Sequence, residues 1–330
     1  MPCKNIPTPL TIAQATERLK QGEIAAIPTE TVYGLAVDAT NDQAIARIYA
    51  AKSRSQNNPL IVHVATTHDA ALYVEWNLRA QQLADVFWPG PLTMILAQRK
   101  NSPICKRVSA GLETLAIRVP KHPIALEILK KTSLPLAAPS ANISGTLSPT
   151  TAQHVIDGFK GQVLVVDGGQ TKIGLESTVV DLTQTPAIIL RPGSITREKL
   201  QAVIPIGQPA QEKSSQPKSP GQFGKHYAPK QPLRLNATNV EQREALLSFG
   251  TNSIENATKC LNLSPKGNLA EAASNLYQML HELDHPQFSC IAVAPIPDVD
   301  VGVAINDRLR RASQKSEVRG QRSEVSTALK

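Results

Sequence analysis

EIAAIPTETVYG, residues 23–34, is a short apolar run that passes directly into a turn of polar side chains. The run from Glu23 to Pro28 predicts a β-strand, because isoleucine and alanine dominate it and Gly22 ends the helical pattern before it. The turn then carries two threonine hydroxyls and the Glu30 carboxylate, and polar groups in a turn behind a strand can point into a cleft. An ordinary surface turn would explain residues 28–34 equally well, so the neighbouring segments must distinguish the two interpretations.

Short strand-like runs alternate with helical runs over residues 6–206. Ile12, Ala15 and Leu19 recur at helical spacing before the first strand, and Asn41 caps a second helix after it. Such alternation is typical of α/β domains. Further strands are expected at residues 60–65, 92–97, 114–120, 163–167, 177–182 and 187–191.

A Pro-rich segment separates this region from a second one. Residues 207–232 contain five prolines among Ser, Gln and Lys, a composition that sustains neither a helix nor a central strand. Strands at 233–235 and 290–295, with helices at 240–249, 269–282 and 303–312, then predict a small second α/β domain. We therefore expect domains at residues 1–206 and 233–313, a linker at 207–232 and a disordered basic tail at 314–330.

Composition places the chain of 330 residues among globular proteins, with 41% hydrophobic and 19% charged residues. Its four cysteines are far apart, and no stretch approaches the roughly 18 apolar residues of a membrane span, so we expect a soluble, cytoplasmic protein. The net charge of +8 owes much to residues 308–330, where seven basic residues outnumber Glu317 and Glu324. Such a tail is either simply solvated or makes a weak, salt-sensitive contact with RNA.

The strongest conventional motif is His281-Glu282-Leu283-Asp284-His285, which matches the H-E-x-x-H pattern of zinc hydrolases. Leucines form the core stripe of this helix and leave both histidines on its flank, and Pro286 stops the helix directly afterwards. No third ligand follows, so we interpret the histidines as complements to the helix C-terminus and predict no metal site.

The usual nucleotide-binding motifs are absent from the sequence. No G-x-G-x-x-G occurs, and Ser219 stands where a P-loop ending at Lys225 needs its first glycine.

Two strands carry polar side chains opposite their apolar faces. Alternation in the strand at 60–65 places His63 on the polar side, where a lone histidine is more often structural than catalytic. In the strand at 114–120, Thr114 and Arg118 share a face and lie roughly 13 Å apart at about 3.3 Å per residue. That spacing suits the two ends of an extended site.

Other polar groups follow helices and strands. Lys52-Ser53-Arg54 ends the second helix, where it either complements the helix dipole or clamps a phosphate. Pro139-Ser140-Ala141-Asn142 follows an apolar run and alone would be only a polar loop. Glu176-Ser177-Thr178 and Arg191-Pro192-Gly193 place polar groups at strand edges in the same way.

Taken in order, these segments resemble the YrdC-like L-threonylcarbamoyladenylate synthases. His226-Tyr227-Ala228-Pro229 and the trailing domain resemble the long, two-domain form of that family. The resemblance runs through the whole first domain and rests on residues 28–34, 52–63, 88–93, 110–112, 116–120, 138–142, 148–150, 167–169, 176–178 and 191–193.

The resemblance implies a twisted, open, mixed α/β sheet whose concave face holds a large basic cavity, followed by a small Rossmann-like domain. It implies an enzyme that condenses L-threonine, bicarbonate and ATP into threonylcarbamoyl-AMP and pyrophosphate. The product would serve N6-threonylcarbamoyladenosine formation next to the tRNA anticodon, through a tRNA threonylcarbamoyl transferase. This nucleotidyl transfer needs positioning and positive charge, with Mg²⁺ expected on ATP, but no enzyme nucleophile.

Site residues follow from motif position. The residues that would hold the phosphates and the carbamate are Lys52, Arg54, Ser140 and Asn142. Those that would hold threonine are Thr31, His63, Arg118 and Ser177. Those on the nucleotide side are Arg54, Asn58, Thr114, Ser140, Ser148 and Arg191.

The linker is expected to close over the cavity as a lid through Phe223, His226 and Tyr227. Gly224 stands where the family usually has a tyrosine, so Phe223 would stack on the nucleotide instead.

Two other functions stay open. One is a non-catalytic RNA-binding module that uses the basic cavity, although 4% aromatic residues is few for such a reader. The other is a zinc hydrolase built on His281 and His285.

Overall fold

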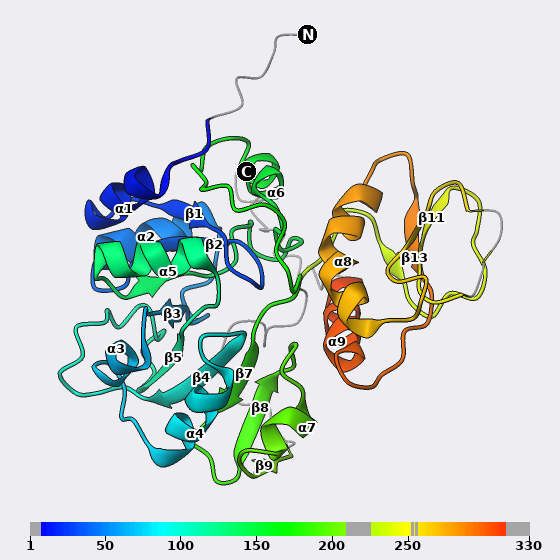
Figure 1. The fold of residues 1–330 in the computed structure, drawn as a ribbon. Coiled ribbons are helices and arrows are strands. Elements are labelled where there is room, and N and C mark those ends of the chain that lie inside the picture. Colours follow the sequence, from blue (N-terminus) through cyan, green and yellow to red (C-terminus); the bar gives the residue numbers. More distant parts are fainter. Residues whose placement is uncertain (1–7, 209–225, 252–253, 255–256, 315–330) are drawn as a thin grey trace, which may run out of the picture.

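The computed structural model describes residues 8–208, 226–251, 254 and 257–314, which form two α/β domains (Figure 1). The first domain is built on a nine-stranded mixed sheet and the second on a four-stranded parallel sheet. The predicted fold class is confirmed.

The first domain runs through α1 (Ile12–Lys20), β1 (Ala25–Ile27), β2 (Gly34–Asp38), α2 (Asp42–Ala51), β3 (Ile61–His63), α3 (Thr67–Ala71), α4 (Leu78–Phe87), β4 (Leu92–Ala97), β5 (Thr114–Arg118), α5 (Pro123–Thr132), β6 (Leu136–Ala137), α6 (Ala152–Gly158), β7 (Thr178–Asp181), β8 (Ala187–Arg191), α7 (Arg197–Gln201) and β9 (Ile206–Gly207). The second domain runs through β10 (Leu233–Arg234), β11 (Glu244–Ser248), β12 (Cys260–Asn262), α8 (Leu269–Leu283), β13 (Cys290–Val293) and α9 (Gly302–Ser313).

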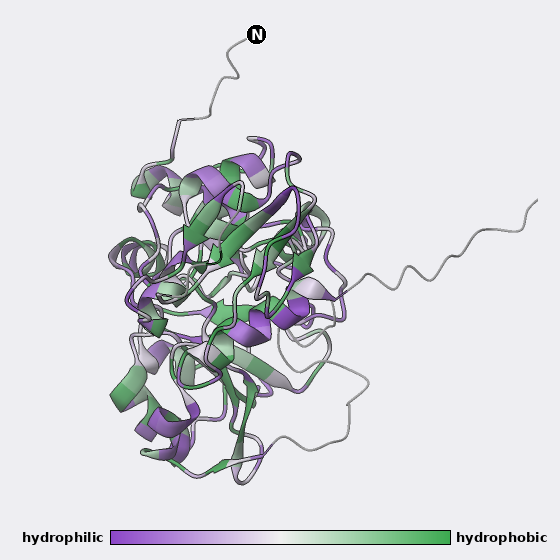
Figure 2. Ribbon diagram, turned by 90° about the vertical axis from the view of Figure 1, so that its right-hand side faces the viewer, coloured by the Kyte–Doolittle hydropathy of each residue, from purple (hydrophilic) through white to green (hydrophobic). Residues whose placement is uncertain are grey.

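The first sheet has the order β1-β2-β6-β3-β5-β4-β7-β8-β9. At its centre β3 and β5 pair in parallel, with His63 opposite Arg118. Because successive side chains on a strand alternate, Val62 and Ile117 enter the main hydrophobic core while His63 and Arg118 face the other way. Figure 2 shows the apolar character of the strands against the mixed polar and apolar helices around them. The predicted alternation in both strands is confirmed.

The second sheet has the order β10-β13-β11-β12, and all of its pairs are parallel. The helix predicted at residues 240–249 is wrong, because Glu244–Ser248 forms strand β11. All five of its residues are buried, and β11 lies between β13 and β12. An apolar run this short does not reveal by periodicity whether it is a buried strand or a buried helix.

The strand predicted at residues 163–167 is also wrong in part. Val165 forms only an isolated bridge with Ala26. The Ala26 amide donates to the Leu164 carbonyl oxygen, and the Val166 amide donates to the Ala26 carbonyl oxygen. The segment therefore extends the sheet edge at β1 by a single bridge rather than by a full strand.

The two domains share a hydrophobic cluster. Val32, Leu147 and Leu175 of the first domain belong to the same cluster as Leu276 and Tyr277 of α8. In Figure 1, α8 and α9 lie on the side of the second domain that faces the first. The domains therefore meet through an apolar interface that α8 covers.

Close backbone approach makes this interface tight at Gly174. A Cβ atom there would lie only 2.6 Å from the Ala273 carbonyl oxygen, and the residue has φ +74°. Both facts require glycine at this position.

None of the helices within the described ranges combines the length and apolar character needed to cross a bilayer. Most of the expected linker, residues 209–225, and most of the expected tail, residues 315–330, lie outside the described residues.

Candidate active site

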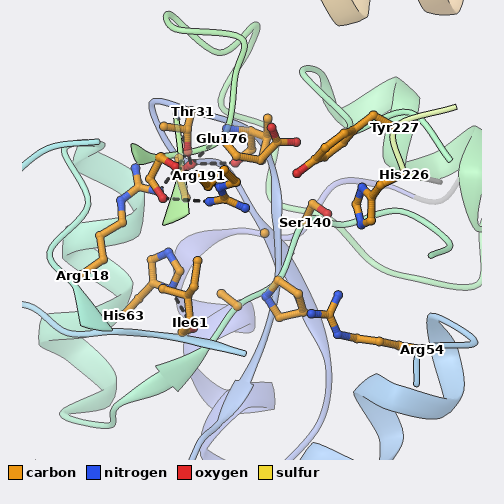
Figure 3. Close-up of a pocket in the computed structure, with 16 residues that line it drawn as sticks. Thr31, Arg54, Ile61, His63, Arg118, Ser140, Glu176, Arg191, His226 and Tyr227 are labelled. Carbon is orange, nitrogen blue, oxygen red and sulfur yellow. Dashed lines mark hydrogen bonds between the residues drawn. The ribbon is translucent and has the colours of Figure 1, made fainter. Parts of the chain in front are cut away.

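A pocket opens on the face of the first sheet opposite the main core. Ile61 and His63 of β3 and Arg118 of β5 line it from the sheet, and His226 and Tyr227 line it from the linker. In Figure 3, Arg118 and His63 lie toward one end of this pocket and Arg54 and His226 toward the other. The pocket is lined by Thr29, Thr31, Val32, Gly34, Arg54, Ile61, His63, Arg118, Ala138, Pro139, Ser140, Glu176, Ser177, Arg191, His226 and Tyr227.

Lys52 lies fully buried at the C-terminal end of α2 and holds the loop that carries Ser140. Its Nζ donates to the carbonyl oxygens of Ser140 at 2.5 Å and Asn142 at 2.6 Å, and to Asn142 Oδ1 at 3.3 Å. Ser140 Oγ donates to the same Oδ1 at 2.6 Å. Burial, together with the Arg54 charge, lowers the pKa of Lys52 well below its usual value. Lys52, Ser140 and Asn142 therefore form one hydrogen-bonded unit, in which Lys52 fixes the loop from behind.

Arg54 follows α2 and is held in the pocket wall by neutral oxygens. Its Nε and Nη2 donate to the carbonyl oxygen and Oδ1 of Asn58 at 3.1 and 2.5 Å, and Nη2 also donates to the Pro59 carbonyl at 2.9 Å. Burial lowers the pKa of Arg54 to about 10, so the guanidinium stays charged at neutral pH. Because these three contacts are neutral, they leave the positive charge of Arg54 for an anion in the pocket.

At the opposite end, Arg118 is fixed by three contacts. Nε donates to the Gly90 carbonyl at 3.1 Å, Nη1 to Thr31 Oγ1 at 3.0 Å and Nη2 to Glu30 Oε1 at 2.6 Å. The Glu30 pair is a buried salt bridge, and Glu30 Oε2 is buried without a hydrogen-bond partner. This end therefore combines a fixed guanidinium, a threonine hydroxyl and a carboxylate with one oxygen left over.

His63 lies next to Arg118 as a neutral imidazole. Its Nδ1 is 3.2 Å from the Ile61 carbonyl oxygen, which fixes the proton on Nδ1 and leaves Nε2 as an acceptor. Burial and the neighbouring Arg118 charge lower the pKa of His63 to about 3. His63 is thus an uncharged hydrogen-bond acceptor at neutral pH.

Arg191, at the end of β8, lies against the segment that leads into β7. Its Nε donates to the Ser177 carbonyl and its Nη2 to Ser177 Oγ, both at 3.1 Å. Ser177 Oγ lies a further 2.8 Å from Thr93 Oγ1 of β4. Burial lowers the pKa of Arg191 from its ordinary value. These contacts set Arg191 as a third fixed cation in the wall, after Arg54 and Arg118.

Among the described residues that line the pocket, Glu176 is the one carboxylate, and both domains hold it. Oε1 accepts from Ser148 Oγ at 2.5 Å and Oε2 from Arg308 Nε of α9 at 2.8 Å, while Tyr277 Oη lies 3.2 Å from each oxygen. Burial would raise the pKa of Glu176, but the charges of Arg308 and Arg191 outweigh it and lower the pKa to about 2. The carboxylate is therefore ionised at neutral pH.

The end of the linker crosses the pocket as a strap, residues 226–228. The Ala228 amide donates to the Gly145 carbonyl at 2.8 Å, and the His226 ring lies edge-on to the Tyr227 ring with centroids 4.0 Å apart. Tyr227 is fully buried and has φ +63°, and burial lowers the pKa of His226 to about 3. The strap therefore closes one side of the pocket with a neutral imidazole and a phenol.

Comparison with known proteins agrees with this two-domain arrangement. Residues 17–193 match the Sua5_yciO_yrdC family, described as telomere recombination, and residues 195–314 match the C-terminal domain of threonylcarbamoyl-AMP synthase. The threonylcarbamoyl-AMP synthase of Bacillus subtilis is 39% identical over 324 residues, covering 92% of both chains. The chain belongs to the threonylcarbamoyl-AMP synthase family.

Two further comparisons concern Pyrococcus abyssi. Its threonylcarbamoyl-AMP synthase is 37% identical, with 89% of this chain and 92% of the relative covered. The crystal structure of P. abyssi Sua5 complexed with L-threonine superposes with a TM-score of 0.82 at 35% identity, covering 92% of this chain and 94% of the other. Both domains of the long family form are therefore present here.

The structure of this family member brings most of the sequence-predicted site residues to the pocket. Those that line it are Thr31, Arg54, His63, Arg118, Ser140, Ser177, Arg191, His226 and Tyr227. Those that support a lining residue or loop from behind are Lys52, Asn58, Asn142 and Ser148. Thr114 shares the β5 face with Arg118 but is not among the lining residues, and Phe223 lies outside the described residues.

Sequence reasoning missed four residues that the structure places in the pocket wall or directly behind it. Glu30 and Glu176 stood inside quoted motifs, yet neither was assigned a role. The sequence signal that could have revealed them is a carboxylate flanked by threonine or serine within an apolar stretch. A carboxylate buried in such a place requires a cation as its partner. Tyr277 and Arg308 carried no local signal, because only the docking of α8 and α9 brings them to Glu176.

His281 and His285 do not form the pair that their spacing suggests. Helix α8 ends at Leu283 with Asp284 as its cap, so His285 lies beyond the helix. His281 is not merely on the helix flank as predicted: its ring stacks on His154 of the first domain at 3.9 Å, and its Nε2 lies 3.2 Å from the Ser148 carbonyl oxygen. His281 is therefore an interdomain contact.

Proposed function

We propose that this protein is an L-threonylcarbamoyladenylate synthase, which joins L-threonine, bicarbonate and ATP into threonylcarbamoyl-AMP and pyrophosphate. The observation that carries the proposal is the polarity of the pocket. Arg54, held only by neutral oxygens, lies toward one end, while Arg118, Thr31 and neutral His63 lie toward the other. The names of the relatives and the P. abyssi complex with L-threonine support the same assignment.

The amino acid is assigned to the Arg118 end. Arg118 and Thr31 offer hydrogen bonds to its carboxylate and hydroxyl, and His63 Nε2 accepts a hydrogen bond from its hydroxyl or amine. Neutral His63 suits this role because a second positive charge there would repel the ammonium. Glu30, on the same turn as Thr31, is not among the lining residues and holds Arg118 in place from behind.

The nucleotide is assigned to the end that holds Arg54, with Arg191 and the Ser140 loop. The amine of threonine attacks carbon dioxide derived from bicarbonate and loses a proton to give a carbamate. A carbamate oxygen then attacks the α-phosphorus as the bond to pyrophosphate breaks in line. Fixed cations stabilise the charge that moves onto the leaving pyrophosphate, so no enzyme nucleophile is needed.

Mg²⁺ is proposed as a companion of ATP rather than as a resident ion. Among the described residues no group of three or more His, Cys, Asp or Glu side chains could hold a metal ion. Both oxygens of Glu176, the carboxylate that lines the pocket, already accept hydrogen bonds. The donor set therefore does not form a cage, and a magnesium ion would depend on the phosphate oxygens of ATP.

The product is a mixed anhydride of a carbamic and a phosphoric acid, which reacts readily with nucleophiles. We propose that a tRNA threonylcarbamoyl transferase consumes it to modify N6 of an adenosine next to the anticodon. The basic tail would add at most a weak RNA contact, and its last residues, 315–330, lie outside the described part of the chain.

An omission assay tests this function. Purified protein is given ATP, Mg²⁺, L-threonine and bicarbonate, and pyrophosphate is measured while each component is left out in turn. Threonylcarbamoyl-AMP, identified by mass, should form only in the complete mixture. Pyrophosphate release that does not depend on threonine and bicarbonate would contradict the proposal.

A further inference from the structure

Thr93 of β4 is a buried polar residue that the proposed function does not use. Its side chain is fully buried, and it is not among the residues that line the pocket. The antiparallel register of β4 on β5 places Thr93 opposite Arg118, on the same face of the sheet. On its other side Thr93 pairs with Val179 of β7, which in turn pairs with Arg191 of β8. Thr93 therefore lies in the row of the sheet that carries both Arg118 and Arg191.

The Thr93 hydroxyl has a single hydrogen-bond partner among the described residues, Ser177 Oγ at 2.8 Å. Ser177 lines the pocket, and its Oγ also accepts from Arg191 Nη2 at 3.1 Å. A hydroxyl has one proton to donate and two lone pairs that accept, so either oxygen could be the donor in the bond between Thr93 and Ser177. The direction of this bond decides what Ser177 presents to the pocket.

The two directions differ in cost. If Ser177 donated to Thr93, the Thr93 proton would be buried without an acceptor, and a buried donor without a partner loses its hydration and gains nothing in return. If Thr93 donates to Ser177, donors from Thr93 and Arg191 occupy both lone pairs of Ser177 Oγ. The Ser177 proton then remains for a ligand in the pocket. Only this second direction pairs every buried group, so Thr93 is the donor.

We propose that Thr93 is a positioning residue, which fixes Ser177 Oγ as a hydrogen-bond donor to the carboxylate of L-threonine. This inference rests on the proposed function and deepens it, because Arg118, opposite Thr93 in the sheet, is assigned to the same carboxylate. With both lone pairs occupied, Ser177 cannot accept from the ammonium group. The amine is left to an acceptor such as His63 Nε2, so Thr93 helps to set which way round threonine binds.

The test compares Thr93→Val, Thr93→Ser, Ser177→Ala and the double variant Thr93→Val/Ser177→Ala in the full-length protein. Valine keeps the branched shape of threonine without its hydroxyl, and serine keeps the hydroxyl. Thr16→Val is the matched control, because Thr16 of α1 is also buried and its hydroxyl donates to the Ile12 carbonyl at 2.8 Å, outside the pocket lining.

Three measurements are made on every variant. Calorimetry gives the affinity for L-threonine in the absence of ATP. Pyrophosphate release gives kcat and the KM values for threonine and ATP. Thermal unfolding reports on the stability of the fold.

Thr93→Val should weaken threonine binding about three- to tenfold, the range expected for one neutral hydrogen bond. The KM for ATP should change much less. Thr93→Ser should keep most of the wild-type affinity, because it keeps the donor. Thr16→Val should lower the unfolding temperature and leave both KM values as in wild type.

The double variant adds a readout that a structural role would not move. Since Thr93 acts through Ser177 Oγ, Thr93→Val should cost no further threonine affinity once residue 177 is alanine. The double variant should also unfold at a higher temperature than Ser177→Ala, in which the Thr93 hydroxyl is buried without a partner.

The proposal is overturned if Thr93→Val leaves threonine affinity unchanged, or if the effects of Thr93→Val and Ser177→Ala simply add. It is also overturned if Thr93→Val raises the KM for ATP instead, because Ser177 would then donate to the nucleotide. Calorimetry separates these failures from a failure of the proposed function. If wild type binds L-threonine but releases no threonine-dependent pyrophosphate, and Thr93→Val still weakens that binding, the role of Thr93 stands.

Discussion

Arg118 has structural contacts on all sides of its guanidinium and is also the residue proposed to bind the threonine carboxylate. Its guanidinium is fixed by Gly90, Thr31 and Glu30, and His63 lies beside it with Nε2 free to accept. Arg118→Met should raise the KM for threonine by about 10- to 100-fold, the equivalent of a charge-assisted hydrogen bond of roughly 1.5–3 kcal/mol. Steady-state pyrophosphate release with threonine as the varied substrate measures this effect.

The control for Arg118 is the double variant with Glu30→Gln, which avoids leaving a buried carboxylate without its cation. Thermal unfolding should show that the double variant is more stable than Arg118→Met alone. Should threonine affinity stay unchanged while ATP affinity collapses, the assignment of the two ends of the pocket is reversed.

At the scale of secondary-structure elements, the sequence predicted the helices and strands whose apolar and polar residues repeat with a recognisable period. Residues 269–282 matched α8 to within one residue, because the long apolar stripe of this helix is visible in the chain. Strand β11 was mistaken for a helix, because five buried residues in a parallel sheet show no alternation.

The histidines of the H-E-x-x-H motif should now behave differently from each other. His285→Ala should leave synthase activity unchanged, because that residue lies beyond α8. His281→Ala should lower activity about two- to tenfold, since a buried aromatic contact worth roughly 0.5–1.5 kcal/mol beside Ser148 is lost. Pyrophosphate release and metal analysis of the purified protein check this prediction. Stoichiometric zinc that disappears with both substitutions would overturn it.

Contact between the domains should also depend on pH through Glu176. Its pKa is lowered from 4.5 to about 2 in the folded protein, so the unfolded state binds the proton more tightly. The stabilisation is therefore fully present above about pH 4.5 and is lost as the pH falls toward 2. It amounts to about 3 kcal/mol.

Urea unfolding from pH 6 down to about pH 2, followed for wild type and Glu176→Gln, measures this linkage. The difference in unfolding free energy between the two proteins should shrink as the pH falls. A constant difference across this range would show that Glu176 does not gain its low pKa from folding.

At the scale of the whole molecule, local motifs predicted nearly all of the pocket wall that the first domain supplies. They did not predict Arg308 and Tyr277, which reach Glu176 only because the second domain docks on the first, with α8 against Gly174. The end of the linker was predictable only in part. His226 and Tyr227 were expected at the pocket and line it, but their burial depends on the second domain.

Truncation after Gly207 tests what the second domain and the strap contribute together. The shortened chain keeps the whole nine-stranded sheet but loses His226 and Tyr227, which line the pocket, and Arg308 behind them. It should still bind ATP, although more weakly, because Arg54 and its Asn58 support remain. Its pocket should be open to water on the strap side, so the labile adenylate should hydrolyse before release. The decisive measurement is threonylcarbamoyl-AMP formed per ATP consumed, with thermal unfolding to confirm that the shortened chain is folded. A lower ratio than in the full chain is expected, whereas equal ratios at equal rates would mean that the linker is only a tether.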